Sequence, residues 1–262
     1  MPHLKHDNPL GQLLDWQTVS PLSPLRLRND ELHIWCIKLK LEEHQKETAF
    51  RLLSDIQRDK YQRRTTTQLK DAYLASRYYL LKLLAGYSSI KAEQVRLAYS
   101  RLNKPYLEPN PNDVEFNFTD TSYQGESTGL FAFTNRRPVG VDIEALSRGA
   151  NFSAIAAKRF SSAEIAYASD ELGSIDPHRF LSIWTRKEAY GKATGKGINF
   201  KMRDVDLATN DKFVLDFHDD HAMTKEYRLH QIRINQQLVA SVVHEGHQPL
   251  AIKAFRSTNH FP

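Results

Sequence analysis

The stretch Gly140-Val141-Asp142-Ile143-Glu144 alternates apolar and acidic side chains. Alternate side chains of a β-strand share a face, so this pattern predicts a strand with Val141 and Ile143 in a core. Asp142 and Glu144 then point together to the other face, about 6.6 Å apart along the strand. Two such carboxylates can converge on Mg²⁺, which also accepts phosphate oxygens. Taken alone, the pentapeptide fits a half-exposed strand with a solvated acidic face better than a metal site.

The periodicity on either side of this strand predicts two comparable α+β halves that meet near Pro138. Before it, we expect strands at 32–41, 95–99, 114–119 and 130–134, and helices at 43–62 and at 68–85, the second stopped by Gly86. After it, we expect helices at 152–159, 162–171 and 177–194, and strands at 213–217, 227–234, 238–243 and 250–255. The sequence therefore predicts an α+β fold with an N-terminal half at 1–138 and a C-terminal half at 139–262.

The helix expected at 177–194 carries a second group of charges. Leu181, Trp184, Glu188 and Lys192 lie at i, i+3, i+7 and i+11, so they form one stripe that begins apolar and ends charged. Lys187 is next to Glu188. A surface pair of Glu188 and Lys192, worth about 0.2–0.5 kcal/mol, explains the charges equally well when the helix is taken alone. Combined with the acidic strand, a third carboxylate and two lysines suit phosphoryl transfer, where a metal holds phosphate oxygens and cations offset developing charge.

Composition narrows the class of protein without selecting one. The 262 residues are 40% hydrophobic and 26% charged, with a formal net charge of +5, which suits a polyanionic partner. Cys36 is the only cysteine, and the sequence has no secretory signal and no apolar stretch of membrane-spanning length. We therefore expect a cytoplasmic protein with no membrane partner. The basic residues are dispersed, which disfavours a nucleic-acid-binding module. That module and another Mg-dependent phosphoryl-transfer enzyme, such as a nuclease, are the alternatives.

The strand and the helix together resemble the signature of the Sfp-type 4′-phosphopantetheinyl transferases. The family pattern is Gly-hydrophobic-Asp-hydrophobic-Glu followed, some forty residues later, by Trp-x-x-Lys-Glu-x-x-x-Lys. Residues 140–144 and 184–192 match it, and the close at Gly195-Lys196-Gly197 is similar. Two upstream stretches resemble further family elements: Asn103–Tyr106 resembles the Lys-Pro element, and Phe116–Thr119 resembles the start of Phe-Asn-x-Ser-His-Ser.

The resemblance implies a pseudo-twofold monomer of two similar α+β halves with coenzyme A bound in the cleft between them. It implies transfer of 4′-phosphopantetheine from coenzyme A to a serine of an acidic apo carrier protein, with release of 3′,5′-ADP and without nucleic acid as a partner. Asp142, Glu144 and Glu188 would hold one Mg²⁺, which also binds the diphosphate. Glu188 would help to deprotonate the serine through a water, and Lys192 would assist departure of 3′,5′-ADP.

The resemblance also implies residues that bind coenzyme A. Its phosphates would be contacted by cations of both halves and by one hydroxyl: Arg58, Lys60, Arg77, Lys104, Thr119, Lys187 and Lys192. Where the family has a histidine on the 3′-phosphate, this chain has Asp120, whose charge repels phosphate. We therefore expect Arg58, Lys60 or Arg77 to recognise the 3′-phosphate, and Asp120 to turn toward a backbone or basic partner.

Glu164 follows Phe160-Ser161, at a family position near the active site. The run Ser161-Ser162-Ala163-Glu164 is also a capping box, which accounts for the pattern without catalysis. We therefore expect Glu164 to be structural.

Overall fold

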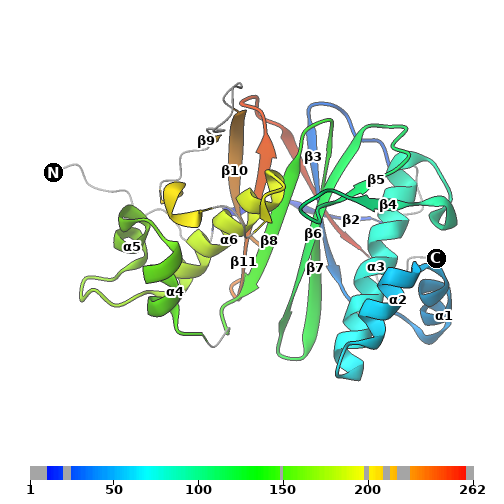
Figure 1. The fold of residues 1–262 in the computed structure, drawn as a ribbon, viewed down its shortest axis with the longest axis horizontal. Coiled ribbons are helices and arrows are strands. Elements are labelled where there is room, and N and C mark those ends of the chain that lie inside the picture. The colour runs from blue at the N-terminus through cyan, green and yellow to red at the C-terminus, as the bar shows by residue number, and fades with distance from the viewer. Residues whose placement is uncertain are drawn as a thin grey trace.

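The computed structural model describes residues 11–19, 25–147, 150–197, 201–208, 213–216 and 225–257, the segment 213–216 for its backbone alone. Within these ranges the chain forms two α+β units side by side, each a mixed sheet with helices on its outer face (Figure 1). None of the described helices combines the length and the apolar character that a membrane crossing requires.

The first sheet has the strand order β2-β12-β3-β7-β6. Its antiparallel centre is β3 (Glu31–Lys38), β7 (Glu126–Asn135) and β6 (Val114–Tyr123), and β6 and β7 form a long hairpin. The strands β2 (Trp16–Val19) and β12 (Ala251–Ser257) add in parallel at the other edge. A separate short hairpin of β4 (Leu97–Tyr99) and β5 (Pro105–Leu107) lies in front of this sheet in Figure 1.

The second sheet has the order β1-β10-β11-β8, with β9 paired to β10. Its antiparallel centre is β8 (Val139–Ala145), β11 (Leu238–Glu245) and β10 (Lys225–Arg233). The strand β9 (Phe213–Asp216) is antiparallel to β10, and β1 (Gln12–Leu13) is parallel to it. Because β1 joins this sheet and β12 joins the first, each terminal strand pairs within the opposite half.

The helices close the outer faces. The first sheet is covered by α1 (Glu43–Leu52), α2 (Asp55–Gln62) and α3 (Thr67–Ser88), and η1 (Ala92–Gln94) follows. The second sheet is covered by α6 (Pro177–Ala193), flanked by α4 (Phe152–Arg159), α5 (Ser162–Ala168) and η3 (Met202–Asp204). A further apolar core, which includes Ile34, Ala132, Val141 and Val242, joins residues of both sheets.

Most expected elements are present, but several boundaries differ for local reasons. The single helix expected at 43–62 is broken, because Ser54 caps a second helix with its side chain. Gly86 lies inside α3, which ends instead at Ser89 in the left-handed conformation (φ 55°). The hairpin of β6 and β7 is longer than expected, since Gln124 and Gly125 both have positive φ and close a tight turn. The last residue of the strand expected at 213–217 lies outside the described residues.

Candidate active site

Gly140 lets helix α6 approach strand β8 at backbone distance. A Cβ atom at Gly140 would lie 2.1 Å from the carbonyl oxygen of Ala189 and 2.3 Å from the nitrogen of Ala193, so only glycine fits. Side chains alternate along a strand, so Asp142 and Glu144 share the face of Gly140 and point toward α6. The opposite face carries Val141 into the core between the sheets, as the sequence predicts.

Asp142 is the best-defined acidic group of this face. Its Oδ1 accepts from Lys192 Nζ at 2.7 Å and from Thr119 Oγ1 at 3.3 Å. Lys192 Nζ also donates to the carbonyl oxygen of Val141 at 3.0 Å. The other oxygen, Oδ2, is buried and has no hydrogen-bond partner. A buried carboxylate oxygen without a partner is costly, so this atom fits a cation that completes it.

Glu144 and Glu188 flank Asp142 on β8 and α6. The indole nitrogen of Trp184 donates to Glu144 Oε1 at 3.2 Å, so the start of the charged stripe of α6 lies against β8. Lys192 contacts Asp142 two helical turns later, and Glu188 lies between these two contacts on the same stripe. Across the described residues, no three His, Cys, Asp or Glu side chains form a ready-made metal cluster. The stripe therefore aligns the three carboxylates without closing them around one point.

A cavity of about 290 Å³ opens beside this acidic face. Four of the predicted cations line it, namely Lys60, Arg77, Lys104 and Lys192. They come from α2, α3, the link between β4 and β5, and α6, so the cavity draws on both halves of the chain. The remaining lining residues are uncharged, and they are aromatic, apolar, glycine or asparagine: Tyr73, Tyr99, Leu102, Asn103, Pro105, Asn117, Phe118, Gly191, Gly195 and Gly197.

Lys104 connects the β4–β5 link to the second half of the chain. Its Nζ donates to the carbonyl oxygen of Val139 at 3.2 Å and to that of Ala193 at 3.0 Å. The second contact places a cation at the carboxyl end of α6, where the helix dipole favours positive charge. Burial lowers the pKa of Lys104 to about 8, although the nearby carboxylates of Glu115 and Glu245 raise it. The ammonium group is therefore close to its titration range.

Arg77 lies between two aromatic rings at the wall of the cavity. Its guanidinium carbon is 4.4 Å from the ring centroid of Phe118 and 4.9 Å from that of Tyr73, both within cation–π range. Arg77 Nε and the Tyr73 hydroxyl are both buried without a hydrogen-bond partner. Burial lowers the pKa of Arg77. Two orphaned donors beside one cavity are suited to an anionic ligand.

Sequence reasoning missed three residues of this aromatic end. Tyr73 and Tyr99 line the cavity, and Arg64 lies 5.1 Å from the ring centroid of Tyr73. Lys60 lies 5.7 Å from the ring centroid of Tyr99. The tyrosines look like ordinary apolar positions of a helix and a strand in the sequence. The only available signal was the density of arginine and lysine between residues 58 and 77.

Three of the predicted coenzyme contacts do not line this cavity, and one of them, Thr119, donates to Asp142 instead. Arg58 does not line the cavity; its guanidinium lies 5.6 Å from the ring centroid of Phe50 and 3.6 Å from Asp55, on the outer side of α2. Lys187 is fully buried, and its Nζ donates to Glu164 at 2.8 Å, to the carbonyl oxygen of Val205 at 2.7 Å and to that of Met202. With three acceptors, the ammonium group has no proton left for a phosphate. In this structure both cations pack against protein groups, so their phosphate contacts stay a prediction that the geometry does not favour.

Glu164 forms the predicted capping box and also links neighbouring segments. It accepts from the nitrogen of Ser161 at 2.8 Å, and its own nitrogen bonds Ser161 Oγ at 3.1 Å. Its second oxygen accepts from the nitrogen of Leu207 at 2.8 Å. Together with Lys187, the fully buried carboxylate ties α5, α6 and the segment 201–208 to one another.

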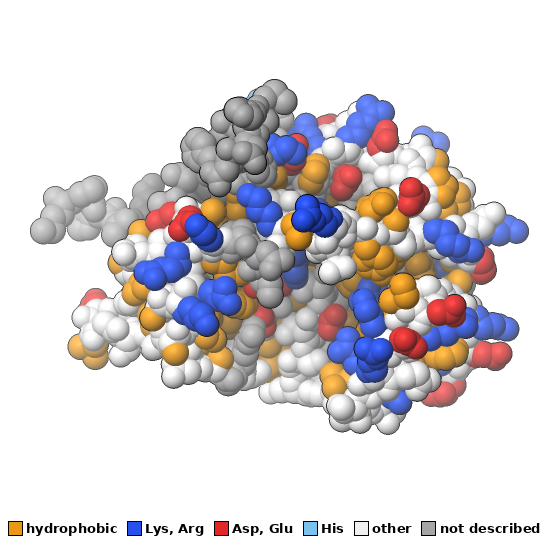
Figure 2. All heavy atoms as spheres, in the orientation of Figure 1, with side chains coloured by type: hydrophobic (Ala, Val, Ile, Leu, Met, Phe, Trp, Pro, Cys, Tyr) orange, Lys and Arg blue, Asp and Glu red, His pale blue; other side chains and the backbone are white. Residues whose placement is uncertain are grey.

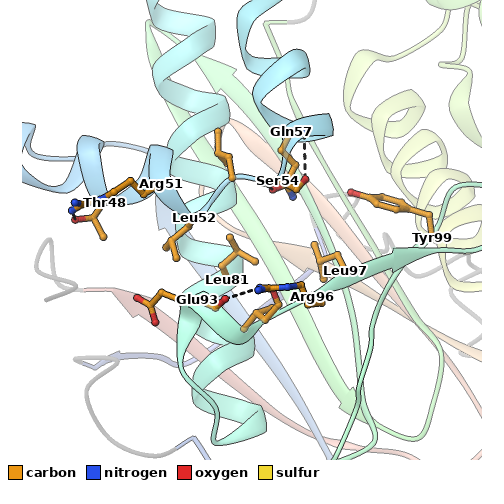
Figure 3. Close-up of a pocket in the computed structure, with 12 residues that line it drawn as sticks. Thr48, Arg51, Leu52, Ser54, Gln57, Leu81, Glu93, Arg96, Leu97 and Tyr99 are labelled. Atoms are coloured by element: carbon orange, nitrogen blue, oxygen red, sulfur yellow. Dashed lines mark hydrogen bonds between the residues drawn. The ribbon is translucent and has the colours of Figure 1, made fainter.

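A second cavity, of about 530 Å³, lies between α1, α2, α3 and β4 (Figure 3). Its floor is aliphatic, formed by residues such as Leu52, Leu81 and Leu97, with guanidinium groups from Arg51 and Arg96. Arg96 donates to the carbonyl oxygens of Glu93 and Val95. Lys192, the partner of Asp142, lines the 290 Å³ cavity but not this one, so the larger cavity is a weaker candidate for phosphate chemistry despite its size.

The charged surface agrees with a local site rather than a broad interface. Figure 2 shows Lys and Arg side chains scattered over one face, with Asp and Glu among them. No single basic tract of the kind that follows a nucleic-acid backbone is visible there. The Lys and Arg side chains of the candidate site instead line the 290 Å³ cavity, beside Asp142.

The fold and site define an α+β protein with a cation-lined pocket next to an acidic strand and a lysine-bearing helix. Comparison with known families supplies the narrower class: residues 138–243, which contain this strand and helix, match the model of the 4′-phosphopantetheinyl transferase superfamily. The chain carries a domain of that superfamily.

Three relatives carry names of the same kind. The chain is 28% identical over 186 residues to 4′-phosphopantetheinyl transferase HetI of Nostoc sp., covering 70% of this chain and 76% of the relative. It is 34% identical over 149 residues to the L-aminoadipate-semialdehyde dehydrogenase-phosphopantetheinyl transferase of Rattus norvegicus, covering 52% and 46%. It is 29% identical over 136 residues to 4′-phosphopantetheinyl transferase gsp of Aneurinibacillus migulanus, covering 50% and 52%. The chain thus spans about half the length of the latter two relatives.

Proposed function

We propose that this protein transfers the 4′-phosphopantetheine group of coenzyme A to a serine of an apo carrier protein and releases 3′,5′-ADP. The carrying observation is the Lys192–Asp142 contact of 2.7 Å beside a cavity lined by four cations. The superfamily match on the same strand and helix favours this activity over the nuclease and nucleic-acid-binding alternatives.

The proposed reaction is a displacement at the phosphorus that carries the pantetheine. The serine oxygen forms a bond to that phosphorus, and the bond from phosphorus to the bridging diphosphate oxygen breaks, so the electron pair leaves with 3′,5′-ADP. Glu188 takes the serine proton, directly or through a water. Lys192, next to the cavity, offsets the charge that develops on the leaving phosphate.

Asp142, Glu144 and Glu188 are the residues that would hold a divalent cation, which we propose to be Mg²⁺. Their hard oxygen donors suit that ion, and the buried, unpartnered Oδ2 of Asp142 is the atom that most needs one. When bound, the ion supplies charge stabilisation for the diphosphate oxygens. Thr119 and Lys192 hold Asp142 in place through Oδ1, which leaves Oδ2 directed to another partner.

We also propose a cytoplasmic, pseudo-twofold monomer whose carrier partner is acidic. The two sheet-and-helix units support the pseudo-twofold arrangement. The net charge of +5 would speed encounter with an acidic carrier. Among the coenzyme contacts, we assign the diphosphate to Lys104 and Lys192 and the 3′-phosphate to Arg77 and Lys60, because these four side chains line one cavity.

The test is incubation of the protein with Mg²⁺, coenzyme A and several apo carrier proteins. We expect a carrier mass increase of one phosphopantetheine, and a matching appearance of 3′,5′-ADP. The variant Glu188→Gln should abolish the mass increase, whereas Glu171→Gln, which removes an exposed acid outside the cavity, should leave it unchanged. The absence of modification on every carrier would refute the proposal.

A further inference from the structure

The aromatic end of the 290 Å³ cavity carries cations that are held by aromatic rings. Lys60, Arg64 and Arg77 contact the rings of Tyr99, Tyr73 and Phe118. No carboxylate of the described residues lies within ion-pair distance of these three cations. Such an arrangement keeps the cations in place through ring contacts and leaves their charge for a ligand.

Asp120 is the acid whose charge reaches this group. It follows Phe118 by two positions on β6, so both side chains leave the strand on the face that looks toward α3. Loss of hydration raises its pKa, and the charges of Arg77, Arg64 and Lys192 oppose that rise. The carboxylate is therefore close enough to these cations to act on them electrostatically, but it makes no ion pair with any of the described residues.

We propose that Asp120 is a specificity-determining residue. It reduces the preference of this end of the cavity for a ligand with a phosphate monoester over a ligand without one. Its negative charge lowers the positive potential at Arg77 and repels an incoming phosphate, while a ligand that lacks the monoester is affected far less. The inference rests on the proposed function, since coenzyme A carries such a monoester at its ribose 3′ position. It also predicts the ligand preference of the site: ligands without the 3′-phosphate should bind more readily than expected from the basic residues of the lining alone.

The burial of Arg77 explains why one distant charge should matter. A guanidinium held between two rings is screened by less water than a surface arginine, so a nearby charge changes its interaction with an anion more strongly. Among the described residues, no carboxylate forms an ion pair with Arg77, and its Nε has no hydrogen-bond partner, so none of them dominates the effect of Asp120. In this partly solvated setting, one charge removed should change binding by about fivefold.

The experiment compares the dissociation constants of coenzyme A and 3′-dephospho-coenzyme A by calorimetry, without a carrier protein. Their ratio reports the value of the 3′-phosphate alone. Asp120→Asn keeps the side-chain shape and removes the charge, and we expect it to raise the preference for coenzyme A by about fivefold. Glu126→Gln is the matched control, because it removes one exposed acid from the same hairpin, where Glu126 pairs with Lys38. It should leave the ratio unchanged.

A cycle with Arg77→Gln tests whether Asp120 acts through Arg77. In that background the preference should be small, and adding Asp120→Asn should change it by less than twofold, against about fivefold in the parent. An unchanged ratio in Asp120→Asn, or an equal change in Glu126→Gln, would overturn the inference while coenzyme A binding upholds the proposed function. If neither ligand binds the parent protein, the proposed function fails first and the inference falls with it.

Discussion

At the β8–α6 end of the cavity, Lys192 is ion-paired with Asp142 at 2.7 Å and Lys104 donates to two backbone carbonyls. At the α3–β6 end, Arg77 lies against the rings of Tyr73 and Phe118, and its Nε has no hydrogen-bond partner among the described residues. The first end fixes its charged groups through protein contacts before any ligand arrives. The second end leaves its cations available for a ligand. We therefore expect the α3–β6 end to contribute more to anion affinity than to catalysis.

This difference follows from what holds each end in place. The β8–α6 end is positioned by close packing at Gly140 and by the buried contacts of Lys187. The α3–β6 end is positioned by aromatic side chains that also serve as its contact surface. Damage to the packing of α6 should therefore affect transfer and stability together, whereas changes at the aromatic end should affect ligand preference with little loss of stability.

The largest expected effect comes from Lys187→Met. The substitution leaves the fully buried Glu164 carboxylate without its cation, so we expect the free energy of unfolding to fall by about 3–5 kcal/mol. Urea denaturation measures the loss. The double variant with Glu164→Gln removes the unpaired charge and should recover part of it. Lys225→Met, which breaks a partly exposed pair with Glu245, should cost less than about 1 kcal/mol. Equal losses in both lysine variants would contradict the buried-pair interpretation.

Asp142→Asn should separate the two ends functionally. We expect transfer to a carrier to fall by about 10²–10³-fold, since the carboxylate holds Lys192 and offers the unpartnered Oδ2 to a cation. Binding of 3′,5′-ADP should change only a few-fold, because the aromatic end is intact. Single-turnover transfer and calorimetry on the same preparation provide the two readouts. A parallel collapse of 3′,5′-ADP binding would show that the ends are not separable.

The sequence predicts the β8–α6 end better than the aromatic end. Alternation over 140–144 and the stripe from Trp184 to Lys192 need only regular strand and helix geometry, and the structure aligns them as expected. The contacts of Lys187 could not be predicted from the sequence. Its partners are Glu164 and the carbonyls near 202–205, and local sequence does not determine where those segments lie.

The α3–β6 end depends on long-range placement throughout. Arg64 follows α2, Tyr73 and Arg77 lie on α3, and Phe118 lies on β6, so only tertiary packing brings them together. The parallel pairing of β12 with β3 could not be predicted either, because strand propensity near residue 251 does not indicate which strand pairs with β12. Charge type alone selected Lys60 and Arg77 as candidates, and it equally selected Arg58, which faces Phe50 instead.

Gly140→Ala tests the packing that sets the β8–α6 end. The added methyl group would meet the carbonyl oxygen of Ala189 at 2.1 Å, so α6 must move away from β8. We expect a loss of about 1–3 kcal/mol in the free energy of unfolding and a larger loss in transfer than in 3′,5′-ADP binding. Gly125→Ala is the control: nothing lies within 4 Å of its added Cβ, so its cost should be confined to the strained turn. An unaltered transfer rate in Gly140→Ala would argue against a packing-defined site.

The smallest effect concerns Lys104, whose cation should bind phosphate only while it is protonated. Burial lowers its pKa to about 8, so affinity for 3′,5′-ADP should fall as the pH rises through that value, by no more than about tenfold between pH 7 and pH 9. The sign for stability is the reverse. Since the folded-state pKa lies below the ordinary lysine value, the unfolded chain binds more protons above about pH 8, and Lys104 should make folding more favourable as the pH rises.

Lys104→Arg supplies the matched variant, because a guanidinium stays charged throughout this range. Calorimetric titrations with 3′,5′-ADP, which has no thiol to ionise, should show the pH dependence in the parent and its loss in Lys104→Arg. If both proteins lose affinity in parallel, another group is titrating. Lys104 would then serve only to join the β4–β5 link to the carboxyl end of α6 through the carbonyl oxygen of Ala193.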